Sequence, residues 1–129
     1  MKFTEQREDS ANLIRRYGPD YIVVGERELR ESCIVGATSI TPWPPRGVDE
    51  LTIDHLPALF ALNPEVVVLA TGTTQKFPRA ALRAEFAIRK IGLEVMEIGA
   101  ACRTYNVLVG EGRNVLAAVL LPATRKQSE

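Results

Sequence analysis

Two uninterrupted apolar runs constrain the fold of this chain more than any other feature. Apart from one acidic residue, the segments 65–70 and 115–121 consist of Val, Leu and Ala only. Each segment therefore predicts a strand that is buried on both faces. Between them lie an amphipathic helical pattern at 78–91, a strand pattern at 93–98 and a helical pattern at 100–109. Alternating buried strands and helices predict an α/β core.

The first part of the chain has a different rhythm, that of short strands joined by tight turns. Turn signals at Gly18-Pro19-Asp20 and Gly25-Glu26-Arg27 separate segments rich in β-branched residues. We expect strands at 12–17, 21–24 and 33–40, which form an antiparallel meander. The prolines of Thr41–Gly47 then end regular structure. Asp54 is expected to cap a helix that extends to Leu62.

Composition excludes several classes of function. The 129 residues fit one domain, 1–129, and 16 basic against 16 acidic residues give no net charge. Zero net charge argues against nucleic-acid binding and permits self-association. The charged start at Met1–Ser10 does not fit a signal peptide, and no apolar run approaches the ~20 residues of a spanning helix. Two cysteines and one histidine match no metal-ligand spacing, so we expect a soluble cytoplasmic protein without metal or cofactor.

Two sites in the α/β region could carry chemistry. Thr71-Gly72-Thr73-Thr74 follows a buried strand, where outward N–H groups can cradle an anion, although an ordinary turn at the strand exit explains the same pattern. Cys102 lies near the start of the helix expected at 100–109, where the helix dipole and Arg103 favour a thiolate. It has no histidine nearby in sequence, so we interpret it as a buried, free, structural cysteine without catalytic duty.

The residues that follow Cys102 form two faces of that helix. Ala101, Tyr105 and Leu108 are expected to face the core, whereas Arg103 and Asn106 share another face. The second face could bind a carboxylate or a partner backbone, or could tie neighbouring loops together. We expect Arg103 to be partly buried and to matter more to stability than to ligand binding.

Three further side chains are candidates for contacts. Glu111 and Arg113 flank a glycine turn and can pair with each other, or with Arg103 and Glu97. Trp43, in the proline-rich loop, either caps the edge of the core or stands exposed as an anchor for a protein partner. We favour the core cap.

The last third of the chain carries a specific motif. The segment Gly99–Leu108, GAACRTYNVL, is followed by Glu111-Gly-Arg113 and by an apolar strand that ends at Pro122. With the early meander, the Thr41-Pro-Trp43 loop and the turn at Gly72-Thr73, this pattern resembles a family of proteins of unknown function. That family includes mitochondrial complex I assembly factor 3, an adipogenesis-associated eukaryotic protein and many small bacterial proteins.

The resemblance implies a three-layer α/β fold with a central mixed sheet flanked by helices. It implies no established catalytic activity and no cofactor, and its mitochondrial member is an assembly helper for a respiratory membrane complex. The chain departs from the family pattern at Ile98, where a hydroxyl residue is usual. Because the chain shows no targeting extension, we expect a bacterial member.

Two functional hypotheses remain open at this point. The first is a non-enzymatic interaction or assembly factor that binds a protein partner through a surface near Trp43 and residues 102–106. The second is a small-molecule or anion binder, or an unrecognised enzyme, that uses the crevice at Gly72 and Gly99. The candidate binding residues are Gly72, Thr73, Gly99, Cys102, Arg103, Tyr105, Asn106, Glu111, Arg113 and Trp43.

Overall fold

A computed structural model describes residues 11–123 of the chain, so the expectation about Met1–Ser10 lies outside the described residues. The strands are β1 (Ile14–Gly18), β2 (Tyr21–Val24), β3 (Arg27–Leu29), β4 (Cys33–Gly36), β5 (Ser39–Pro42), β6 (Val66–Ala70), β7 (Gly92–Met96) and β8 (Val115–Val119). The helices are α2 (Pro57–Phe60), α3 (Ala80–Ile88) and α4 (Ile98–Gly110), with single 3₁₀ turns at Val48–Glu50 and Ile53–His55.

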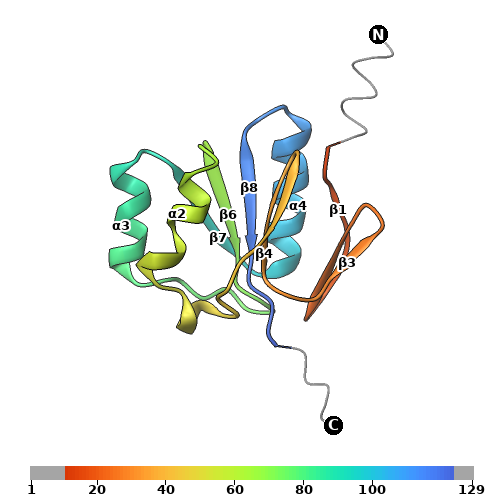
Figure 1. Cartoon of the computed structure of the whole chain (residues 1–129), viewed down its shortest axis with the longest axis horizontal. Helices are drawn as coiled ribbons and strands as arrows, with labels where there is room; N and C mark the ends of the chain where they lie inside the picture. The colour runs from red at the N-terminus through yellow and green to blue at the C-terminus, as the bar shows by residue number, and fades with distance from the viewer. Residues whose placement is uncertain (1–10, 124–129) are drawn as a thin grey trace.

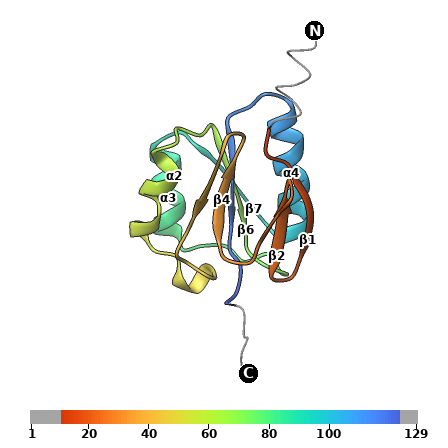
Figure 2. The same ribbon diagram turned by 45° about the vertical axis from the view of Figure 1, so that its right-hand side comes forward.

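The strands form two sheets. A five-stranded mixed sheet has the order β5-β4-β8-β6-β7, in which β8, β6 and β7 run parallel and β4 is antiparallel to both its neighbours. Helices α2 and α3 cover one face of this sheet, while α4 and the antiparallel meander β1-β2-β3 cover the other (Figures 1 and 2). The predicted three-layer α/β fold with an N-terminal meander is confirmed. The third strand of the meander is β3, however, and the expected third strand at 33–40 belongs instead to the mixed sheet, where β4 pairs with β8.

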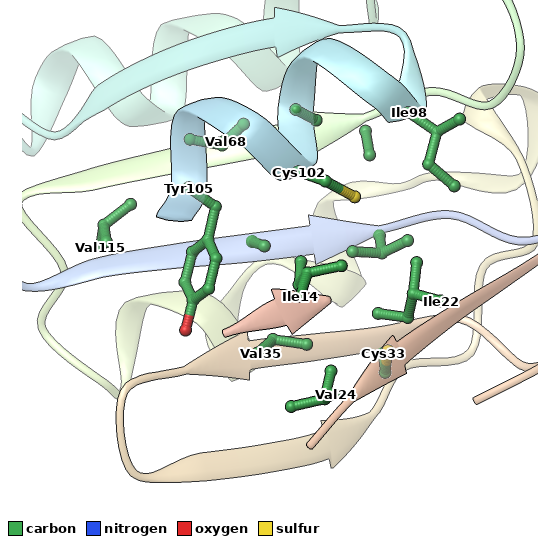
Figure 3. Packing of buried hydrophobic residues seen from close by; sticks show 14 of the residues in the cluster. Ile14, Ile22, Val24, Cys33, Val35, Val68, Ile98, Cys102, Tyr105 and Val115 are labelled. Atoms are coloured by element: carbon green, nitrogen blue, oxygen red, sulfur yellow. The ribbon is translucent and has the colours of Figure 1, made fainter. Parts of the chain in front are cut away.

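Each face of the mixed sheet buries its own apolar cluster, because successive side chains of a strand point to opposite faces. In β6, Val67 and Leu69 pack under α2 and α3, whereas Val68 and Ala70 pack under α4. All four residues are buried, as the apolar run predicted. The cluster under α4 also takes in side chains of β1 and β2, so the meander is held by the same core (Figure 3).

The expected strand at 33–40 is wrong, because the chain reverses within it. β4 and β5 form a hairpin whose two-residue loop is Ala37-Thr38, with Gly36 opposite Ser39. Regular structure was expected to end at Thr41, but Thr41 and Pro42 still belong to β5, so it ends two residues later. Proline is tolerated there because β5 is an edge strand.

The helices also differ from expectation in length. The helix expected from Asp54 to Leu62 is reduced to a 3₁₀ turn and the four residues of α2, and the turn begins after Thr52. The Thr52 backbone N–H donates to His55 Nδ1 at 3.0 Å, which fixes that start.

The remaining boundaries shift by a few residues. Helix α3 is shorter than 78–91, and Ile88, expected on its buried side, is 72% exposed. Ile98, expected to end a strand, instead begins α4. Strand β8 ends at Val119, although the next two leucines stay buried. Within the described part of the chain, no helix is both long and apolar enough to cross a membrane.

Candidate functional site

The N-terminus of α4 carries its own carboxylate. Glu97 caps the helix: its two carboxylate oxygens accept hydrogen bonds from the backbone N–H groups of Gly99 and Ala100, both at 2.8 Å. These bonds, together with the charge of Arg103, hold the pKa of Glu97 below its usual value. Because the free N–H groups of the first turn are already used, this helix end offers little to an external anion.

Gly99 lies in the first turn of α4 beneath the side chain of Tyr17. A Cβ at this position would stand 2.6 Å from Tyr17 Oη, so a larger residue there would force the tyrosine side chain to shift. The Arg103 guanidinium donates to the same hydroxyl at 3.3 Å. Arg103 itself is exposed, so the expectation that it is partly buried is wrong, and its weight in stability stays a prediction.

Asn106 joins α4 to β1. Its side-chain Oδ1 accepts from the Ile14 N–H and its Nδ2 donates to the Ile14 carbonyl, each at 2.9 Å. The ladder between β1 and β2 is irregular just after Ile14, and the Ile14 backbone groups face α4. Asn106 therefore acts as the structural tie that we considered for this face, and it closes the edge of the meander.

Cys102 and Tyr105 point from α4 into the core (Figure 3). The Tyr105 hydroxyl donates to the Asn12 carbonyl at 2.7 Å, and burial raises the pKa of this phenol. Cys102 is a free, buried thiol whose pKa is raised to about 12, first by burial and then by Glu97, with Arg103 opposing. The prediction of a free, buried cysteine is confirmed, and its lack of catalytic duty stays a prediction.

The loop after β6 lines a separate hollow. Thr71 Oγ1 donates to the Thr74 carbonyl at 2.7 Å and accepts from the Lys76 N–H at 3.1 Å, while Gly72 takes a φ of 92°. Gly72 and Thr73 line a cavity of about 400 Å³. Gly99 does not line this hollow, although the Gly72 carbonyl accepts from the Ile98 N–H at 2.7 Å, so the crevice expected at Gly72 and Gly99 stays a prediction.

Trp43 caps the core. It is 3% exposed in the cluster beneath α2 and α3, and its Nε1 donates to the His55 carbonyl at 3.0 Å. The interpretation as a core cap is confirmed, so the indole is not an exposed anchor. The expected pairs of Arg113 are wrong, because its guanidinium pairs with Glu65 at 3.1 Å. Glu111 is exposed.

The structure thus divides the candidate residues into groups. Gly99, Arg103 and Asn106 meet β1 along one side of α4, whereas Gly72 and Thr73 belong to the loop after β6. Sequence reasoning missed Tyr17, which covers Gly99. Its only signal was an aromatic residue at the end of an expected strand. The assignment of these residues to a binding site stays a prediction.

Comparison with known proteins places the chain among relatives of several kinds. A "13 kDa major membrane protein" of Francisella tularensis is 25% identical over 122 residues, which is 93% of this chain and 99% of that protein. The NADH dehydrogenase (ubiquinone) 1 alpha subcomplex assembly factor 3 of Bos taurus is 32% identical over 121 residues, or 91% of this chain. The chain spans 65% of the length of that bovine relative.

A solved structure and a family model agree with these matches. The NMR structure of a Xanthomonas campestris protein superposes with a TM-score of 0.84 at 34% identity, over 100% of this chain and 99% of that one. Residues 14–120 match a family described as "Protein of unknown function (DUF498/DUF598)". The match covers both sheets and the helices α2, α3 and α4 of the described residues, and it confirms the resemblance seen in the sequence: the chain belongs to this family.

Proposed function

We propose that this protein is a non-enzymatic, cytoplasmic interaction factor that helps to assemble other proteins. Relatives named as assembly factor 3 of NADH dehydrogenase support this role. The state of Cys102, the side chain considered above as a nucleophile, supports a non-enzymatic role. Its thiol is buried, and its raised pKa keeps it protonated at neutral pH. Two buried free cysteines fit a reducing compartment.

One observation carries the proposal: α4, β1 and the residue just before β1 expose apolar and cationic side chains. We define the α4–β1 surface as Leu13, Tyr17, Arg103 and Val107. Leu13 and Tyr17 are about two-fifths exposed, and Val107 is 59% exposed. Arg103 lies one helical turn before Val107, on the same side of α4. Exposed aromatic, aliphatic and arginine side chains at one place are typical of protein-binding hot spots.

Cross-linking tests this surface directly. A photoreactive phenylalanine analogue replaces Val107 in one version of the chain and Ile88, on α3, in a matched control version. We expect a protein partner to be captured from the 107 position and not from the 88 position. The captured partner is then purified, and its affinity is measured for wild type, Val107→Glu and the control Ile88→Glu.

The expected loss for Val107→Glu is about tenfold in affinity or more, since a charge is buried against an apolar contact. Ile88→Glu should bind as wild type does. Equal binding by both variants would exclude the α4–β1 surface. Turnover of a small molecule by the purified chain would contradict the non-enzymatic role.

Anion binding is the second candidate, and the cavity beside Gly72 favours it. Arg46 and Lys76 line this hollow together with Gly72 and Thr73. Arg46 already pairs with Glu50 at 3.0 Å, which weakens the attraction for a second anion. Phosphate titration followed by NMR would detect the site: shifts at Gly72 and Thr73 that disappear in Lys76→Gln would establish it, and their absence would eliminate it.

A further inference from the structure

Strand β7 ends the mixed sheet with one edge open. In the described part of the chain it pairs only with β6, in parallel. The Gly92 N–H donates to the Glu65 carbonyl and the Met96 carbonyl accepts from the Thr71 N–H. In a parallel ladder every second residue turns both backbone groups to the same neighbour, so Gly92, Glu94 and Met96 face β6. Leu93 and Val95 therefore turn their N–H and C=O groups outward.

A side-chain amide of the same chain already donates a hydrogen bond to this edge. The Gln75 side-chain Nε2 donates to the Val95 carbonyl at 2.8 Å. The same edge carries three more outward groups, the Leu93 N–H, the Leu93 carbonyl and the Val95 N–H. Leu93 and Val95 lie about 7 Å apart along the strand. Such a row of groups is complementary to an extended backbone and to no compact ligand.

A groove of about 470 Å³ runs between this edge and α3. Phe86, Ile91, Leu93 and Val95 contribute its apolar walls, and Phe77 stands beside it with 62% of its surface exposed. Arg83 also lines the groove, where its Nε donates to the Pro78 carbonyl. A strand added to β7 would place every second side chain over this groove, and apolar side chains fit it best.

The opposite face of β7 determines which charge is favoured at the alternate positions of an added strand. Glu94 borders the groove as well, but Leu93 and Val95 pack toward α3, so the pleat of the strand turns the exposed Glu94 side chain to the other face. In an added strand, Lys or Arg would therefore be favoured at the position beside Glu94. A second copy of this chain fits poorly: if Leu93 of one copy pairs with Val95 of the other, the two Glu94 carboxylates stand directly opposite and repel.

The other end of the mixed sheet is less suited to the same use. Strand β5 carries Pro42, which has no N–H to donate. Strand β7 thus combines an open edge, which no proline blocks, with an adjoining groove.

We propose that β7 binds an extended segment of a partner protein as an added strand, with apolar side chains in the α3–β7 groove alternating with Lys or Arg beside Glu94. This role goes beyond the proposed interaction through the α4–β1 surface. It uses different residues, so either proposal can fail without the other.

NMR titration of the ¹⁵N-labelled full chain with short peptides tests the proposal. The probe is Ac-Thr-Lys-Val-Lys-Val-Lys-Thr-NH₂, in which valine would face the groove and lysine Glu94. We expect saturable shifts of the Leu93 and Val95 amides and of Phe77. A second peptide, with Glu in place of each Lys, should bind about fivefold more weakly or worse. No saturable shift at β7, or equal binding of both peptides, would overturn the proposal.

Backbone methylation tests strand addition without changing the protein. One probe is N-methylated on its valines and another on its lysines, because antiparallel pairing uses the valine N–H groups and parallel pairing those of lysine. We expect one of the two to lose binding and thereby to report the strand direction. If both bind as the parent peptide does, no strand is added.

A charge reversal tests the recognition by Glu94. Glu94→Lys should weaken the lysine peptide and strengthen the glutamate peptide, each by about fivefold. Glu26→Lys is the matched control: it makes the same charge change at the exposed turn between β2 and β3, in the other sheet, and should leave both affinities unchanged. Equal effects of the two variants would show a general charge effect and would refute recognition at β7. The methylation experiment decides the proposal even if Glu94→Lys does not fold.

Discussion

Replacing Asn106 with alanine should destabilise the protein by detaching α4 from β1. The side chain makes two 2.9 Å hydrogen bonds to the Ile14 backbone, across 92 residues of sequence. Ile14 is buried, so water cannot readily replace either bond. An unsatisfied buried backbone group costs about 1–3 kcal/mol, and relaxation at this edge recovers part of it. We expect a loss of roughly 2–3 kcal/mol in the free energy of unfolding.

Thermal unfolding measures this loss. For a chain of this length, 1 kcal/mol corresponds to about 3–5 °C in Tm, so Asn106→Ala should lower Tm by about 6–15 °C. Val107→Ala is the matched control, since its side chain is exposed on the same turn of α4. It should change the free energy of unfolding by no more than about 0.5 kcal/mol. Arg103→Ala should resemble this control, because it loses one 3.3 Å bond to an exposed hydroxyl.

Amide hydrogen exchange gives a more local measurement. In Asn106→Ala, the Ile14 amide should exchange faster than the amides of β6, because only the edge of β1 opens. The reasoning is refuted if Asn106→Ala melts with the control, or if the Ile14 amide remains as protected as in wild type.

Four further outcomes are expected. Tyr105→Phe removes the donor to the Asn12 carbonyl and should cost about 1–2 kcal/mol in urea unfolding; unchanged stability would contradict the role of that bond. The Cys102 thiol, with its pKa raised to about 12, should react with a thiol reagent at mildly alkaline pH far more slowly in the folded than in the urea-unfolded chain, and equal rates would contradict its burial. Folding lowers the pKa of Glu97. The stabilisation that its carboxylate contributes is therefore present above the ordinary glutamate pKa of about 4.3, and it is lost as pH falls through the lowered pKa of the folded state. The stability difference between wild type and Glu97→Gln should therefore shrink on acidification, and a constant difference would rule out the cap as its source. Finally, we propose that the chain is one domain, which predicts a single calorimetric transition in which calorimetric and van't Hoff enthalpies agree.

The buried strands were predictable because their pattern depends on local composition alone. β6 and β8 read as apolar on both faces, and both are buried on both faces. The β4–β5 hairpin was not predictable in the same way. Its loop, Ala37-Thr38, contains none of the Gly, Asn, Asp or Pro residues that usually mark a reversal.

The start of α4 shows a second limit. Four of the six residues from Leu93 to Ile98 are apolar, so the sequence predicts a strand that extends through Ile98. The true boundary is set by Glu97, whose carboxylate caps the helix. Glutamate is not among the preferred residues at this position, and the cap is recognised only once its two hydrogen bonds are seen.

The candidate site depended on contacts that sequence spacing cannot give. The core side of α4 followed from helical periodicity, and Tyr105 is buried as predicted. The partner of Asn106 could not be found, because Ile14 lies in another sheet and the bond involves its backbone rather than its side chain. Arg103 was expected to be partly buried because of its neighbours in sequence, yet it is exposed and lies beside Tyr17.

Two amide side chains show how similar contacts have different consequences in this fold. At β1, Asn106 satisfies both the N–H and the carbonyl of Ile14, so that strand edge is closed and the contact serves stability. At β7, Gln75 satisfies only the Val95 carbonyl, and its own side chain is exposed, so a competing backbone amide can replace it at little cost. The remaining outward groups of Leu93 and Val95 lie along the same edge, beside the groove, and an added strand would present N–H and C=O groups to them at the matching spacing.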